Sequence, residues 1–216
     1  ITIVYLSEWM KNMSTESKAL GRYPYRIIPN GLDFEKYPKQ DKDKLRKELG
    51  IDNGRKNILV VGASLENEQK GFPILFEALN NLNRNDFNFI SIGHLNNKDI
   101  IRNDINHIHI DQIKDIAELN KYYAAADITI IPSKEDNLPN TMLESFANGT
   151  PVMSFSNGGM AEHIKTGDNG VLISSIRVEP LAQNLNDFLD NKYIFDKEKI
   201  RQYAEIIFSD KHQVER

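Results

Sequence analysis

Short apolar runs rich in isoleucine and valine alternate along the chain with segments whose apolar residues recur every three or four positions. This alternation is typical of βαβ units, in which helices cover a parallel sheet. Strands are expected at residues 25–29, 57–63, 87–92, 107–110, 127–132, 151–155 and 170–173. Most of these runs have no polar residue at alternate positions, so we expect both faces to be covered. The pattern predicts an α/β fold with a Rossmann-like, doubly wound parallel sheet.

The segments between the strands carry apolar stripes at helical spacing, and each stripe is expected to face the core. Gly149, followed by Pro151, predicts where the third of these helices ends. Helices are expected at residues 72–82, 116–126, 142–147, 178–190 and 196–209.

The first residues, ITIVYLS, have the apolar pattern of a buried strand, so we expect the chain to be a fragment of a longer polypeptide. Residues 30–45 combine turn residues with mixed charge and form the most linker-like stretch. A domain boundary is therefore expected near Asn30.

Composition excludes several classes of function. The formal net charge of −4 and the lack of a long run of lysine or arginine argue against nucleic-acid binding, so any anion must be bound locally. The chain has no cysteine, which excludes disulfides and thiolate metal sites and fits a reducing compartment. Its apolar runs are shorter than the roughly 20 residues of a membrane span.

The segment from Asp127 to Glu144 carries the clearest functional signal. An apolar strand ends in an acidic loop, which leads into a helix with a carboxylate in its second turn. Ligands of open α/β sheets bind at the carboxyl ends of the strands, where helix N-termini attract anions. Glu144 would repel a phosphate but can accept two hydrogen bonds from a vicinal diol. With Glu135 and Asp136 ahead of the helix, this segment predicts a site for a ribose beside a diphosphate.

Lys70 lies at a second strand-to-helix junction, in the sequence GASLENEQKGF. It is either a solvated surface lysine or, given its place at the end of a strand, a group that reaches a phosphate. Gly71 would allow close approach of a backbone or ligand. Neither a GxGxxG nor a GxxxxGK[ST] pattern follows a strand, so dehydrogenase and NTPase functions lose their main support.

Two further features are ambiguous or structural. Gly158 and Gly159 form either a structural turn or a ligand loop, with Glu162 at the start of the next helix. His163 has no partner at metal-ligand spacing, so it is expected to be structural. The acidic residues at 41–43 mark a helix start.

Several ordered segments resemble the C-terminal, donor-binding half of a GT-B-fold glycosyltransferase of the large retaining family 4. They are YRIIPNGLD (25–33), KGFPILFEAL (70–79), ELNKYYAAADITIIPS (118–133), EDNLPNTMLESFANGTPV (135–152), GGMAEHI (158–164) and NGVL (169–172). The resemblance implies that residues 1–24 are the remnant of an N-terminal acceptor domain with its connection. Residues 25–216 would then form the C-terminal domain, which binds a nucleotide sugar.

The resemblance also implies roles for individual residues. Glu144, the second acid of the family's paired-acid signature, would hold the ribose, and Lys70 would pair with the diphosphate. Counting back from Glu144 places the first acid at Asp136, one methylene shorter than the family's glutamate. Asp136 and Lys70 are the expected catalytic residues. The expected substrate-binding residues are Gly62, Ser64, Lys70, Asp136, Asn137, Leu138, Pro139, Asn140 and Glu144. Ser64 stands where many members carry an arginine.

The implied function is sugar transfer with retention of configuration, from a nucleoside diphosphate sugar, by a hexosyltransferase-type enzyme of bacterial surface polysaccharide or glycoconjugate synthesis. A lysine and helix amides would stabilise the leaving diphosphate without a metal ion or other cofactor. The glycan or lipid-linked acceptor would bind the missing N-terminal domain, so the chain alone is expected to be inactive. The full enzyme would be cytoplasmic and could associate with the inner face of the membrane.

Two alternatives remain at this stage. A nucleotide-sugar epimerase of similar shape would use the same donor half without an acceptor, and a non-catalytic module would bind the donor without turnover. The residue types leave the base, the sugar, the acceptor and the linkage open.

Overall fold

The computed structural model describes residues 1–51 and 54–213 of the chain. Within these residues, six parallel strands form one sheet in the order β5-β4-β3-β6-β7-β8. Their bounds are β3 Lys56–Ser64, β4 Phe87–His94, β5 Asn106–Ile110, β6 Ile128–Ile131, β7 Val152–Phe155 and β8 Gly170–Ile173. The chain builds outward from β3 to β5, returns to the centre with β6 and then builds outward on the other side. This is the strand order of the Rossmann fold, so the predicted fold class is confirmed.

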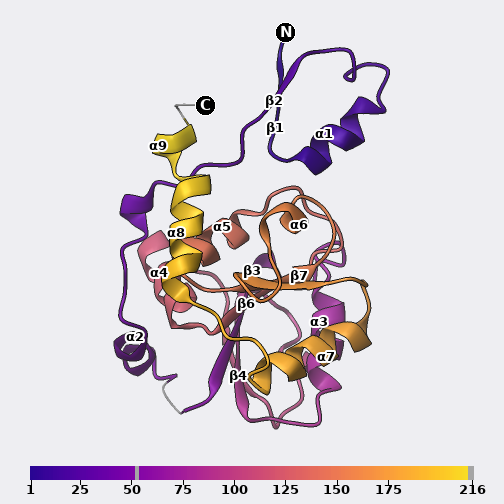
Figure 1. Cartoon of the computed structure of the whole chain (residues 1–216). Coiled ribbons are helices and arrows are strands. Elements are labelled where there is room, and N and C mark those ends of the chain that lie inside the picture. The colour runs from indigo at the N-terminus through magenta and orange to yellow at the C-terminus, as the bar shows by residue number, and fades with distance from the viewer. Residues whose placement is uncertain (52–53, 214–216) are drawn as a thin grey trace.

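Helices cover both faces of the sheet (Figure 1), with α3 and α7 on one side and α4, α5 and α8 on the other. The helices are α2 Lys42–Glu48, α3 Phe72–Asn80, α4 Ile116–Ala125, α5 Asn140–Ala147, α6 Met160–His163, α7 Val178–Leu189, α8 Lys197–Phe208 and α9 Asp210–Gln213, with short 3-10 helices η1 Phe34–Lys36 and η2 Lys98–Ile100. The five helices expected from the apolar spacing all form, within a few residues of the predicted bounds.

Central strand β3 shows why the unbroken apolar runs were informative. Ile58 and Val60 pack into the core shared with α3 and α7, whereas Leu59 packs with Tyr123 of α4 on the opposite face. All three β3 side chains are fully buried. Successive residues of a strand point to opposite faces, so an apolar residue at every position indicates cover on both sides.

The linker-like stretch at residues 30–45 contains regular structure. It contains η1 and the start of α2, whose N-cap Asp41 accepts hydrogen bonds from the amides of Asp43 and Lys44. Leu32 and Tyr37 are buried against α5 and α8. With Leu45, which is buried in the core beside α4, the stretch is anchored to the domain by three apolar side chains.

The N-terminal residues form a separate unit of strand β1 Ile3–Tyr5, helix α1 Glu8–Thr15 and strand β2 Tyr25–Ile27, seen at the top of Figure 1. Among the residues that the structure describes, β1 and β2 pair only with each other, as a two-stranded parallel sheet. The strand expected at 25–29 therefore forms outside the main sheet. The first residues do form a strand, but it is buried only in part: Tyr5 is 8% exposed, whereas Val4 is 54% and Ile1 93% exposed. Two strands and one helix offer too little surface to cover both faces.

β2 pairs with β1 across the expected division between residues 24 and 25, and this division stays a prediction. Among the residues described, no helix has the length and apolar character needed to span a bilayer.

Candidate functional site

A cavity of about 260 Å³ lies where the strand order reverses, between the carboxyl ends of β3 and β6. In open α/β sheets this switch point is the usual ligand site. The wall includes residues 61–64 at the end of β3, residues 130–133 at the end of β6, and Thr141 in the first turn of α5. The predicted site residues in its lining are Gly62, Ser64, Lys70, Asp136 and Pro139. We refer to it as the switch-point cavity.

Lys70 and Asp136 are in direct contact in this cavity, although they are 66 positions apart in the sequence. Lys70 Nζ lies 2.5 Å from Asp136 Oδ2, and Ser133 Oγ donates to the same oxygen at 3.3 Å. The Lys70 side chain is 46% exposed and the Asp136 side chain only 16%. An anion that enters the cavity would therefore compete with Asp136 for an accessible ammonium group.

Gly71 makes this contact possible. Its φ of +69° is left-handed, and a Cβ at this position would lie 1.9 Å from the carbonyl oxygen of Pro132. The loop after β3 can therefore lie against the end of β6 only because residue 71 has no side chain. A hydrogen bond of 3.0 Å from the Lys134 amide to the Gln69 carbonyl joins the same two loops.

Two helices begin at the switch-point cavity without a side-chain cap. Phe72, the first residue of α3, lines the cavity, as do Pro139 and Thr141 at the start of α5. Neither helix has a side-chain hydrogen bond at its N-cap, as is also true of α6 and α7, whereas Ser or Asp side chains cap α1, α2, α4 and α8. Pro139 is the N-cap itself, one position before the first helical turn in which it was expected. Uncapped amides and the helix dipole favour an anion in this cavity.

Glu144 lies one turn beyond Thr141 on α5. Its Oε2 accepts a hydrogen bond of 2.9 Å from the hydroxyl of Tyr123, a fully buried residue of α4. Burial raises the pKa of the Glu144 carboxyl group, and the Tyr123 hydrogen bond acts in the opposite direction. The bond leaves acceptor positions free on the carboxylate. Glu144 itself is not among the residues that line the cavity.

The other three predicted residues have protein partners for their side chains. Asn137 Oδ1 accepts a hydrogen bond from Ser7 Oγ at 2.5 Å, and Asn140 Oδ1 accepts one from Asn30 Nδ2 at 3.1 Å. Leu138 is buried, only 3% exposed, in the core beside α5. A role for Leu138 in ligand binding would therefore fall to its backbone amide.

The glycine turn at residues 157–159 packs against the acidic loop that carries Asp136. A Cβ on Gly158 would lie 1.9 Å from the carbonyl oxygen of Asp136, and one on Gly159 would lie 2.0 Å from that of Asn137. The Gly159 amide donates to the Asp136 carbonyl at 3.1 Å. These contacts give the turn a structural role, one of the two interpretations that the sequence left open.

Helix α1 docks beside this turn, on Glu162 of α6, a contact that the sequence did not predict. The Glu162 carboxylate accepts hydrogen bonds from the amides of Glu8 at 3.0 Å and Trp9 at 2.6 Å. Ser7, the N-cap of α1, is fully buried. A serine before a helix is a recognisable cap signal, but nothing local to it shows that its hydroxyl bonds to Asn137, 130 positions away. The N-terminal unit is thus fixed to the loop that carries Asp136.

His163 fits the structural role expected of it. Its Nδ1 lies 3.1 Å from the Tyr203 hydroxyl, and burial lowers its pKa.

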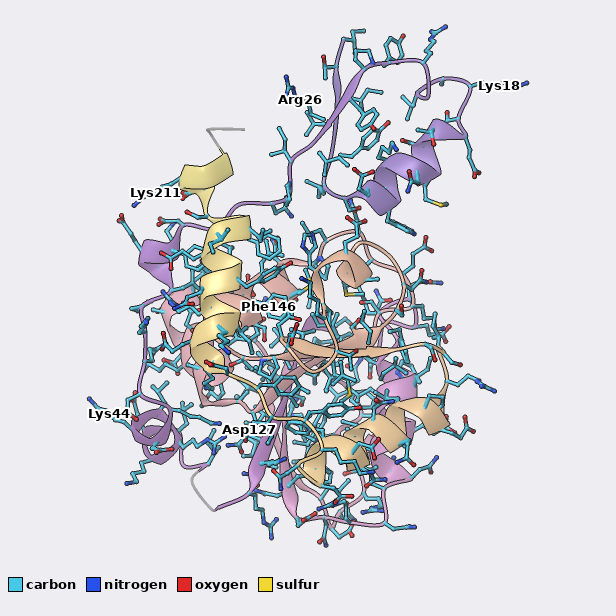
Figure 2. All side chains as sticks on the ribbon, in the orientation of Figure 1. Lys18, Arg26, Lys44, Asp127, Phe146 and Lys211 are labelled. Atoms are coloured by element: carbon cyan, nitrogen blue, oxygen red, sulfur yellow. The ribbon has the colours of Figure 1, made fainter. Side chains whose placement is uncertain are left out.

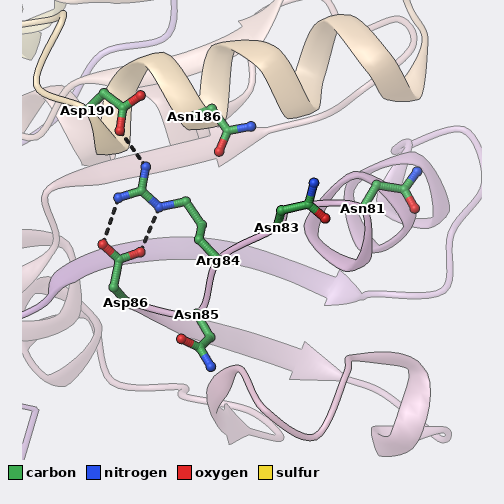
Figure 3. A pocket seen from close by; sticks show the side chains of 7 residues that line it. All are labelled: Asn81, Asn83, Arg84, Asn85, Asp86, Asn186 and Asp190. Atoms are coloured by element: carbon green, nitrogen blue, oxygen red, sulfur yellow. Dashed lines mark hydrogen bonds and ion pairs between the residues drawn. The ribbon is translucent and has the colours of Figure 1, made fainter.

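An open hollow of about 650 Å³ around Arg84 lies near the amino end of β4 (Figure 3). Arg84 pairs with both carboxylate oxygens of Asp86 at 2.7 Å and with Asp190 at 2.6 Å. Two carboxylates thus satisfy the single cation of this hollow, and it holds none of the predicted site residues.

Comparison with known proteins places this geometry in context. Residues 55–191, well over half of the chain, match the family model Glycosyl transferases group 1. The chain is 25% identical over 197 residues to a lipopolysaccharide 1,2-N-acetylglucosaminetransferase of Salmonella typhimurium, an alignment that covers 83% of the chain and 49% of the relative. The chain spans about half the length of the curated relatives it matches.

Solved glycosyltransferase structures share the fold. A sucrose-phosphate synthase of Thermosynechococcus elongatus superposes with a TM-score of 0.81 at 18% identity, over 99% of this chain and 56% of that one. The Anabaena protein HepE, solved in complex with UDP-glucose, gives a TM-score of 0.74 at 19% identity, over 99% of this chain and 62% of that one. The expected GT-B glycosyltransferase fold is confirmed at the level of architecture.

Proposed function

The chain belongs to the group 1 glycosyl transferases, and on this basis we propose that its switch-point cavity binds a nucleoside diphosphate sugar as the donor of a retaining hexosyl transfer. The observation that carries the proposal is the convergence of Lys70 and two uncapped helix N-termini on one cavity. These groups are suited to a diphosphate. The complex of HepE with UDP-glucose supports a donor of this class.

The Salmonella relative acts on lipopolysaccharide by its name. It supports a role in the synthesis of a surface polysaccharide or glycoconjugate.

The contact between Lys70 and Asp136 suggests how the site responds to its donor. The diphosphate would take the Lys70 ammonium from Asp136, because a phosphate carries more charge than one carboxylate. The released Asp136 carboxylate could then accept hydrogen bonds from sugar hydroxyls. As the glycosidic bond breaks, negative charge grows on the diphosphate, where Lys70 and the α5 amides would stabilise it. Glu144 would hold the ribose hydroxyls.

Replacement of Lys70 by alanine tests the phosphate assignment. We expect affinity for the nucleoside diphosphate to fall about 10- to 150-fold, since a hydrogen bond to a charged group contributes about 1.5–3 kcal/mol. Affinity for the matching nucleoside, which presents no charge, should change little. Isothermal titration calorimetry measures both. Lys134→Ala is the matched control, because Lys134 lies in the neighbouring loop but does not line the cavity. Equal losses for nucleoside and diphosphate would make Lys70 a structural residue.

Replacement of Glu144 by glutamine should give the opposite pattern. We expect nucleoside and nucleoside diphosphate to weaken by a similar factor of about 10, because both present the ribose diol to this carboxylate. A nucleotide that lacks the 2′-hydroxyl should lose less. Calorimetry with the ribonucleotide and the 2′-deoxyribonucleotide provides the comparison. Glu77→Gln on the exposed face of α3 is the control. Unchanged affinity for the ribonucleotide would remove Glu144 from the site.

A further inference from the structure

A second cavity, of about 320 Å³, lies at the amino ends of the same two central strands. Lys56 is the first residue of β3, and Asp127 directly precedes β6. Both line this cavity, so it lies at the opposite end of the sheet from the switch-point cavity. Figure 2 labels Asp127 near the lower end of α8. We refer to this space as the amino-end cavity.

Three lysines from separate elements line the amino-end cavity: Lys42 from α2, Lys56 from β3 and Lys197 from α8. Asp127 is the carboxylate in the lining, and both of its oxygens are occupied. Oδ1 accepts from Lys42 Nζ, and Oδ2 accepts from Arg46 Nη2 at 2.5 Å and from the Asn57 amide at 2.7 Å. One carboxylate thus faces four cations.

Carboxylates outside the lining do not balance this charge. Asp190 is bonded to Arg84 at 2.6 Å, and Asp43 is exposed to solvent. The cavity is therefore a local concentration of positive charge in a chain whose formal net charge is −4. Such a concentration inside a half-closed space favours an anion more than the same charges spread over the surface would.

Lys42 is paired with Asp127, but the ammonium groups of Lys56 and Lys197 have neutral partners. Lys197 Nζ donates to the carbonyl of Ala124 at 2.8 Å, and Lys56 Nζ donates to the carbonyl of Phe188 at 2.5 Å. An ammonium group has three donors, so each retains capacity for a further acceptor. Burial, followed by the charge of Lys42, lowers the pKa of Lys197 to about 8. A structural contact with the carbonyl at the end of α4 explains one hydrogen bond of Lys197. It does not explain why Lys42 and Lys56 line the same cavity as Lys197.

The remaining wall is apolar and aromatic. It consists of Pro151 and the rings of Phe188, Tyr193 and Phe195, of which Tyr193 and Phe195 are stacked with centroids 6.2 Å apart. The volume is at the lower end of the roughly 300–1,000 Å³ range of small-molecule sites. The cavity therefore offers charge for a phosphoryl group and a flat surface for a small organic part.

We propose that the amino-end cavity is a second anion site, which binds a small phosphomonoester through Lys42, Lys56 and Lys197. The phosphoryl oxygens accept from the ammonium groups, and the organic part lies against the aromatic wall. This site is separate from the donor site, and the proposal does not depend on the proposed function.

Inorganic phosphate is the probe for the test, and ¹H–¹⁵N NMR on the whole chain detects its binding. The ionic strength is held constant with chloride as the balancing anion. We expect phosphate to shift the amide signals of Lys56, Asp127 and Lys197 in a saturable way, and to do so equally in Lys70→Ala. In Lys56→Met and Lys42→Ala, phosphate affinity at this end should fall at least 10-fold. Lys44→Ala, on the outer side of α2 in Figure 2, is the matched control.

Three results would overturn the proposal. Phosphate-induced shifts confined to the switch-point cavity would place the anion there alone. Shifts that chloride reproduces at the same ionic strength would reflect screening rather than binding. Unchanged affinity in both folded lysine variants would exclude these side chains as ligands. The shift map of the unmodified chain decides the first two points, even if a variant fails to fold.

Discussion

Replacement of Gly71 by alanine is expected to destabilise the fold and weaken donor binding together. The left-handed conformation costs a residue with a Cβ about 1–2 kcal/mol. The new methyl group would also lie 1.9 Å from the carbonyl oxygen and 2.9 Å from the carbonyl carbon of Pro132. Both atoms are backbone, so the loop after β3 must move away from the end of β6. Overpacking of this kind costs a further 1–3 kcal/mol or so.

Gly50→Ala is a matched control for this experiment. Gly50 has a φ of +68°, almost the same as Gly71, but an added Cβ would have no atom within 4 Å. The control isolates the conformational strain of about 1–2 kcal/mol, whereas Gly71→Ala should cost roughly 2–5 kcal/mol. Thermal unfolding should show a decrease in Tm about twice as large for Gly71→Ala, since 1 kcal/mol shifts Tm by roughly 2–4 °C at this chain length.

Donor titration completes the test. Displacement of the loop moves Lys70 from Asp136, so Gly71→Ala should also lower affinity for a nucleoside diphosphate, whereas Gly50→Ala should not. Equal destabilisation by the two substitutions would show that the contact with Pro132 contributes nothing. A folded Gly71→Ala variant with unchanged affinity would separate the loop contact from the site.

The elements of the sheet could be predicted because each strand is a short apolar run between turn residues. The fully buried Ile58, Leu59 and Val60 illustrate the signal, since no exposed position interrupts it. The order of the strands could not be predicted in the same way. Pairing of β3 with β6 joins Ile58 to Ile128, 70 positions later, and no local pattern encodes that choice.

Five of the nine predicted site residues line the switch-point cavity, but their arrangement could not be predicted. Lys70 and Asp136 each stood out at the end of a strand, yet their contact depends on how Gly71 packs against Pro132. The docking of α1 through Glu162 is equally remote in sequence. The amino-end cavity could not be predicted for the same reason, since its three lysines are distant in sequence and belong to three different elements.

The largest effect is expected in the reaction itself, because the chain alone should bind a nucleoside diphosphate sugar and transfer no sugar. Transfer requires an acceptor held against the anomeric carbon. We propose that the acceptor surface belongs to the part of the relatives that this chain does not match, which is about half of their length. Proximity and orientation supply about 7–11 kcal/mol of such a barrier, so its loss would slow transfer by roughly 10⁵- to 10⁸-fold.

Donor titration by calorimetry and product detection by mass spectrometry, on the same sample with candidate acceptor glycans, separate the two properties. We expect measurable donor affinity that Lys70→Ala weakens, together with no glycosylated product above the rate of the uncatalysed reaction. Binding that is weakened by substitution of Lys70 shows that the donor occupies the switch-point cavity. The absence of product then does not result from an unoccupied donor site. Sugar transfer by the chain alone would contradict the proposal that the acceptor surface lies outside this chain, because the chain would then include the acceptor surface as well as the donor site.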